Sequence, residues 1–136
     1  MNATSKDIVD MMAADSELAL TSGVDLFIGN EPAKPRNVVT VFDTPSFPPY
    51  FGLDTIGYEY PSVQIRVRNQ KYDEGIELIE SIKNLLHVRA QETWNGTLYS
   101  VIYCASGPAL LEWDDNGNAV FICNFNVQRR ESNESI

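Results

Sequence analysis

The segment Ser62–Arg68 alternates strictly between apolar and polar side chains. The apolar positions are Val63, Ile65 and Val67, and the polar positions are Gln64, Arg66 and Arg68. Successive side chains of a β-strand point to opposite faces of its sheet, so this pattern predicts a strand with one buried and one polar face. Such a strand fits a sheet that is covered on one side only. The three polar side chains are therefore expected to point outward, where they could contact another protein.

Two amphipathic helices are expected to supply the cover. In residues 4–20 the apolar side chains recur at helical spacing, and Thr21-Ser22-Gly23 ends the pattern. In residues 71–89 a second apolar stripe is expected to be buried. Its members are Tyr72, Ile76, Ile79, Ile82 and Leu86. The acidic residues of this helix fall on the opposite side and are expected to be solvated, with Gly75 as a weak point near its start.

Further strands are predicted from runs of β-branched and aromatic residues. They cover residues 24–29, 37–43, 97–104, 109–113 and 119–128, with turns expected at Ser106-Gly107-Pro108 and Asp114–Gly117. The order is then α-β-β-β-α-β-β-β. This order predicts an α+β fold with a single domain over residues 1–130, followed by a polar tail at residues 131–136. Its antiparallel or mixed sheet is expected to carry both helices on one face.

Residues 44–60 are expected to form a long loop. Thr44–Glu59 contains three prolines, two glycines and four aromatic residues, and no regular period fits it. A loop of this length in a small domain is usually functional, and exposed aromatic rings favour a surface to cover. Two interpretations are open: the loop folds back over its own core, or it is an arm that contacts a neighbouring subunit. In the second, Phe47, Tyr50 and Phe51 are the candidate contact residues.

Charge and composition exclude several classes of function. Nineteen acidic residues stand against ten basic ones, and the resulting net charge of −9 disfavours a tight grip on nucleic acid. No stretch is long and apolar enough to span a membrane, and acidic residues interrupt the N-terminal stretch, so no secretion signal is predicted. Cys104 and Cys123 are expected to be free thiols that behave as small hydrophobic residues.

No site for catalysis, for a cofactor or for a metal ion is expected. His87 is the only histidine, and neither a nucleophile elbow nor a glycine-rich phosphate loop is present. Asp114, Asn116 and Asn118 occupy alternate positions, like the first three ligands of a calcium-binding EF-hand loop. However, the glycine of this segment is misplaced, and Phe125 stands where the bidentate acid belongs. A hairpin turn explains the segment better, and the chain is not expected to be an enzyme.

From Val39 onward the sequence runs VTVFDTP, then a proline-rich aromatic loop, then YPSVQIRVRNQKYDEG. This series resembles the phage minor capsid proteins that act as tail terminators. The positions that carry the resemblance are Phe42, Asp43, Thr44, Pro61, Val63, Gln64, Arg68 and Tyr72. The chain departs from the family at Pro45-Ser46, where a glycine pair is common, and this affects the expected shape of the loop.

The resemblance implies a structural virion protein of a siphophage-type neck. Proteins of this kind form a ring, usually of six subunits, which sits on the tail tube protein and stops its polymerisation. The ring then offers a face to the head–tail connector or stopper protein, and DNA passes through its lumen without specific binding. The implied location is the virion tail or neck, with assembly in the bacterial host cytoplasm. The alternatives are a head-completion or neck adaptor protein and, less favoured, a small α+β enzyme or ligand-binding domain.

Overall fold

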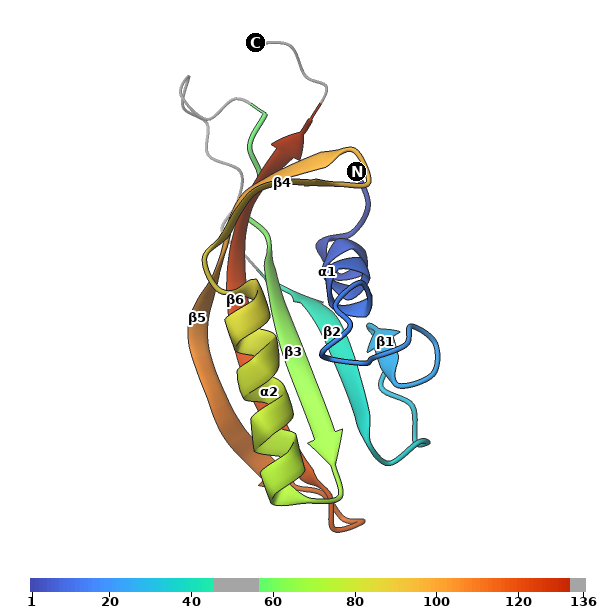
Figure 1. Cartoon of the computed structure of the whole chain (residues 1–136). Helices are drawn as coiled ribbons and strands as arrows, with labels where there is room; N and C mark the ends of the chain where they lie inside the picture. The colour runs from blue at the N-terminus through green and yellow to red at the C-terminus, as the bar shows by residue number, and fades with distance from the viewer. Residues whose placement is uncertain (46–56, 133–136) are drawn as a thin grey trace.

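The alternating segment is the middle of a sheet. The computed structural model describes residues 1–45 and 57–132, and its described strands form one six-stranded sheet of order β1-β2-β3-β6-β5-β4 (Figure 1). The strands are β1 (Leu26–Ile28), β2 (Val38–Thr44), β3 (Ser62–Asn69), β4 (Arg89–Trp94), β5 (Thr97–Trp113) and β6 (Ala119–Glu131). β1 runs parallel to β2, and every other neighbouring pair is antiparallel. The α+β fold and its element order, predicted from the sequence, are confirmed.

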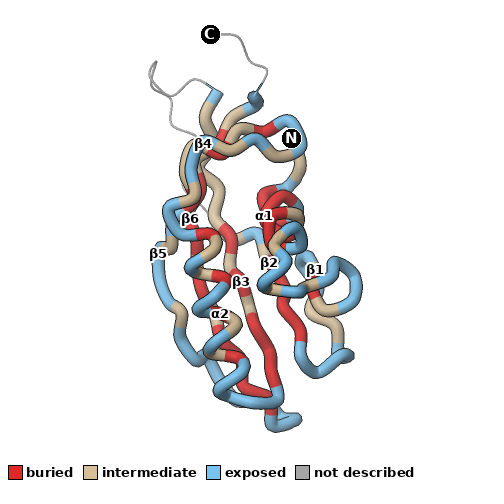
Figure 2. The backbone as a smooth tube through the Cα atoms, viewed as in Figure 1, coloured by how far each residue is buried: buried red, intermediate tan, exposed pale blue. Residues whose placement is uncertain are grey.

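Both helices cover the same face of this sheet (Figure 1). α1 (Thr4–Ala13) packs against β1 and β2, and α2 (Tyr72–Leu86) packs against β3, β5 and β6. The core between them is red in Figure 2, and it includes all three apolar residues of β3 together with Ile79 and Ile82 of α2. Burying each such side chain stabilises the fold by roughly 1.5–3 kcal/mol. The alternation of β3 therefore decides which face of the sheet the helices cover.

The first helix is shorter than the expected residues 4–20 and ends at Ala13. The Asp15 carboxylate accepts hydrogen bonds from the backbone N–H groups of Glu17 and Leu18, at 2.9 and 3.2 Å. A side chain that binds the backbone locally competes with the helical hydrogen bonds, so the chain turns here. Leu18 nevertheless packs against the core, as the apolar stripe predicts.

The second helix ends at Leu86, before the expected residue 89, and Val88 takes a left-handed φ of 63°. β4 follows at once and is absent from the sequence prediction, because its sequence RAQETW shows no clear apolar alternation. Tyr72 is exposed, contrary to the expectation of burial. It lies at the rim of the core, where its ring stacks on Trp113 with centroids 6.3 Å apart.

Gly75 has a packing role that the helix pattern does not reveal. A Cβ atom at this position would lie 2.5 Å from the ring of Phe121 on β6. Glycine lets the backbone of α2 approach the sheet at this point. Gly75, which the sequence marks as a weak point of the helix, is therefore a point of close contact between α2 and β6.

Residues 97–113 form one strand, and the turn expected at Ser106-Gly107-Pro108 is wrong. The register between β5 and β6 shifts on both sides of Ser106, so the glycine and proline form a bulge. Gly107 takes a φ of 89°, and a Cβ atom there would lie 2.8 Å from the Ile122 carbonyl oxygen. The strand bends through the bulge and continues (Figure 1).

Candidate functional site

The face of the sheet opposite the helices carries a row of hydrogen-bonded polar side chains. Ser62 Oγ donates to Asn126 Oδ1 at 2.8 Å, and Gln64 Nε2 donates to Asn124 Oδ1 at 3.1 Å. The amides of Asn124 and Asn126 then donate to the hydroxyl groups of Ser106 and Tyr103 on β5. We call these six residues, Ser62, Gln64, Tyr103, Ser106, Asn124 and Asn126, the polar ladder. It places neutral donors and acceptors across β3, β6 and β5.

Arg66 extends this face beside the polar ladder. Its guanidinium lies 3.5 Å from a carboxylate oxygen of Glu31 and 3.9 Å from one of Glu112. Its side chain is partly accessible, and both contacts are long, so these ion pairs stabilise the fold little. The outward orientation expected for Gln64 and Arg66 agrees with their register positions on β3, opposite Asn124 and Ile122 of β6.

Arg68 lies on the same face but is not accessible, so the expectation that it points into solvent is wrong. Arg68 is only 7% exposed, because the loop between β1 and β2 covers it. The guanidinium donates to four backbone carbonyls of that loop. They are the carbonyls of Pro32, Ala33, Pro35 and Arg36, at 2.7, 3.3, 2.8 and 3.0 Å. Arg68 therefore holds the loop in place.

A signal for this role exists in the sequence. Alternation assigns a side chain to one face of a strand but says nothing of a loop that crosses that face. The loop contains Pro32 and Pro35, which have carbonyls but no N–H groups. A loop with more acceptors than donors needs an external donor, and an arginine with five N–H groups is well suited to this task.

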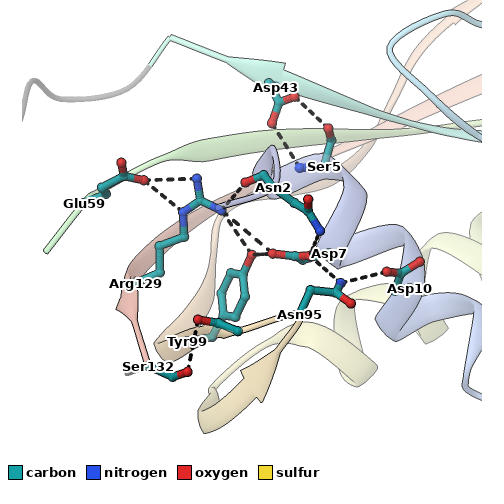
Figure 3. A network of polar contacts seen from close by, with 11 residues as sticks. Asn2, Ser5, Asp7, Asp10, Asp43, Glu59, Asn95, Tyr99, Arg129 and Ser132 are labelled. Carbon is teal, nitrogen blue, oxygen red and sulfur yellow. Dashed lines mark hydrogen bonds and ion pairs between the residues drawn. The ribbon is translucent and has the colours of Figure 1, made fainter. Parts of the chain in front are cut away.

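The most buried polar cluster of the described chain lies at the other end of the sheet, around the N-terminal end of α1 (Figure 3). Asp7 is fully buried and accepts a hydrogen bond from the hydroxyl of Tyr99. Arg129 lies 3.9 Å from the same carboxylate, and it donates to Tyr99 Oη at 3.2 Å and to Glu59 Oε1 at 3.0 Å. Burial, followed by the hydrogen bond to Asp7, raises the pKa of Tyr99. The cluster ties the N-terminal helix to β5, to β6 and to the residues before β3.

This cluster is absent from the sequence prediction. Asp7 does lie in the first turn, but its side chain points inward. Asn95 also donates to Asp7 Oδ1 at 2.7 Å, and Ser5 Oγ donates to Asp43 at 2.6 Å. Since each buried charge has a partner, the cluster stabilises the packing of α1 on the sheet.

The structure also places the two cysteines and the acidic turn that the sequence singles out. Cys104 and Cys123 are free thiols with their sulfur atoms 3.5 Å apart, and burial together with the neighbouring thiol raises the pKa of Cys123 to about 12. Asp114 accepts hydrogen bonds from the backbone of Asn116 and Asn118, which confirms the predicted hairpin turn. No group of three His, Cys, Asp or Glu within residues 1–45 and 57–132 could hold a metal ion. Phe47, Tyr50 and Phe51 lie outside the described residues.

A comparison with protein families identifies the family of the chain. The family model described as bacteriophage tail terminator protein matches residues 6–130, from α1 into β6. The chain belongs to the bacteriophage tail terminator family. No curated protein matches the sequence. The resemblance inferred from the segment after Val39 is thereby confirmed, and this tail terminator is a structural component of the virion tail.

Gln64 and Arg66 are the accessible residues of the open sheet face that the sequence indicates in advance, and the other five residues of the polar ladder come from the structure alone. In the described part of the chain, no helix has the length and apolar character needed to cross a membrane.

Proposed function

We propose that the chain is a ring subunit that caps the tail tube, ends its polymerisation and joins the tail to the head connector. The membership of residues 6–130 in the tail terminator family carries this proposal. A ring of six subunits is the assembly that the family resemblance implies. Each subunit of such a ring needs two different patches, because contacts around a ring are heterologous.

The polar ladder is the face we assign to a protein of the tail or the neck. Its donors and acceptors are neutral, and its side chains already bond to one another, so a partner meets an ordered surface at little cost in side-chain entropy. Gln64 and Arg66 are the residues of this face that we expect the partner to contact. Phe47, Tyr50 and Phe51 stay part of the proposal as an arm toward a neighbouring subunit.

DNA is expected to pass through the ring without binding to it. The chain has a net charge of −9, and a lumen lined by acidic groups repels phosphate. Calculating or measuring the potential of the assembled channel tests this point. A lumen of positive potential would end this part of the proposal.

Electron microscopy of lysates that lack the chain tests the central claim. A terminator is needed to stop the tube, so its loss should give overlong tails. Tails of normal length that stay unattached to heads would instead show a head-completion or neck adaptor. Normal phage in the absence of the chain would remove both functions.

Complementation of the same lysates tests the polar ladder. Gln64→Arg adds one positive charge and extra bulk to the open face without touching the core, so it should leave a folded protein that does not restore tail length. Glu77→Gln is the matched control, because it changes the charge by the same amount on the exposed side of α2. Normal tails with Gln64→Arg would show that this face does not meet a partner.

A further inference from the structure

The two cysteines of the chain meet at the break in the pairing of β5 with β6. The register shifts twice between Cys104 and Ala109, and Cys123 of β6 has no described pairing partner on β5. The bulge therefore leaves room between the strands on the side where both thiols lie. The sulfur atoms of Cys104 and Cys123 are 3.5 Å apart, which brings two thiols from neighbouring strands into direct contact.

The surroundings of this pair give the two thiols different roles. The Cys104 thiol donates toward the carbonyl oxygens of Ser106 and Gly107 in the bulge, at 3.6 and 3.5 Å. Its sulfur can then accept a hydrogen bond from the Cys123 thiol, and this bond adds to the burial that raises the pKa of Cys123. Cys104 is half-buried, whereas Cys123 is buried. Since a reactive thiol must be accessible and able to ionise, Cys104 is the one that meets a reagent first.

Cys104 also lies where β5 loses its outer neighbour. β4 pairs with β5 as far as Ile102, which lies opposite Arg89. Just beyond, the Cys104 N–H donates to His87 Nδ1 at 2.9 Å instead of to a strand. Cys104 is therefore at an uncovered part of the sheet margin, where a small reagent can reach it.

We propose that Cys104 and Cys123 close to a disulfide when the chain meets a small disulfide such as oxidised glutathione. The Cys104 thiolate attacks one sulfur atom of the reagent, which forms a mixed disulfide and releases a first thiol that takes up the Cys104 proton. The Cys123 sulfur then attacks that of Cys104, and its proton leaves with the second thiol. Two electrons and two protons pass from the cysteines to the reagent, so one reagent disulfide becomes two thiols.

The new bond holds β5 to β6 where their backbone pairing is interrupted. The two cysteines are 19 positions apart in the chain, so the bond also restricts the unfolded chain and raises the stability of the fold. Its meaning for the particle rests on the proposed function. A bacterial cytoplasm keeps thiols reduced, whereas release of the particle exposes the finished ring to an oxidising medium. The subunit is thus assembled with two thiols and strengthened after release.

Mass spectrometry of the purified chain after treatment with oxidised glutathione tests the chemistry. The wild type should lose two hydrogen atoms, stay a single chain on a non-reducing gel, and melt about 10 °C higher than after reduction with dithiothreitol. Cys123→Ala should stop at the mixed disulfide and keep one glutathione on Cys104. Cys104→Ser should stay unmodified, because its remaining thiol is buried. Circular dichroism shows that each variant is folded during the reaction.

Four results would overturn the proposal. They are a wild type that keeps both thiols, disulfides that form between chains, an oxidised chain that melts below the reduced one, and glutathione on Cys123 in the Cys104→Ser variant.

Alkylation before and after release tests the role in the particle. The chain from intact infected cells should carry two alkyl groups, and the chain from released particles should carry none. Two alkyl groups in released particles would refute strengthening after release. Normal tails in lysates that lack the chain would instead refute the proposed function, and the purified chain would still decide whether the disulfide forms.

Discussion

Replacing Arg68 with methionine would isolate what its guanidinium contributes to the fold. Methionine keeps most of the aliphatic stem and removes four hydrogen bonds, of 2.7–3.3 Å, to the carbonyls of the loop between β1 and β2. It also removes an ion pair with Glu31 at 3.5 Å. The loop should then lose its attachment to β3.

The magnitude follows from the kind of contact that is lost. A hydrogen bond from a charged donor contributes about 1.5–3 kcal/mol. Most of the loop is exposed, so its carbonyls regain water and the four bonds do not add in full. The ion pair contributes less than about 1 kcal/mol. We expect the free energy of unfolding to fall by about 3 kcal/mol and the melting temperature by about 10 °C.

Urea denaturation of Arg68→Met against Arg66→Met provides the matched comparison. Arg66 lies on the same strand and face, but it has only long ion pairs at 3.5 and 3.9 Å, so its loss should cost less than about 1 kcal/mol. Equal losses in the two variants, or an Arg68→Met variant as stable as the wild type, would refute the assignment of Arg68 as the residue that holds the loop.

Three further variants test points of close contact. Tyr99→Phe removes the hydroxyl that donates to buried Asp7 and should cost about 1–3 kcal/mol in denaturant titrations. Because the pKa of Tyr99 is raised in the folded protein, its hydroxyl loses the proton at lower pH in the unfolded chain. The wild-type free energy of unfolding should therefore fall as the pH rises above 10.0. A variant whose stability falls with pH in parallel with the wild type would contradict this. Gly75→Ala should lower stability by about 1–3 kcal/mol in spite of a better helix propensity, since its Cβ meets Phe121; a higher melting temperature would show that the ring moves aside. Gly107→Ala should cost about 1–3 kcal/mol, because its φ is 89° and a β6 carbonyl is 2.8 Å away; unchanged calorimetric unfolding would disprove this.

The sequence predicts those elements whose apolar period is strong. β3 alternates from Ser62 to Arg68, and the stripe of α2 repeats through Ile79, Ile82 and Leu86, so the fold class and the covered face follow from burial alone. The period is weak where the chain lies at an edge. β4 is half exposed and reads as a polar stretch, and the pair Gly107-Pro108 reads as a turn although it forms a bulge.

The candidate site was predictable only in part, for a related reason. Gln64 and Arg66 point outward because a strand alternates, whereas Arg68 is covered by a loop far away in the sequence. Likewise, Asp7 and Arg129 are brought together across almost the whole chain, and local patterns carry no information on such contacts. A sequence pattern assigns each side chain to one side of a strand or helix. Whether that side chain is accessible depends on which other parts of the chain pack on that side.

The place of β6 has a consequence for how the protein is made. β6 is the last strand to be synthesised, yet it lies between β3 and β5 in the sheet. Until β6 has left the ribosome, β3 and β5 each lack one of their two neighbouring strands, so the nascent chain cannot complete its core. A subunit therefore becomes competent to assemble only after β6 has been synthesised. A chain truncated before residue 119 would lose the centre of the sheet, not its margin.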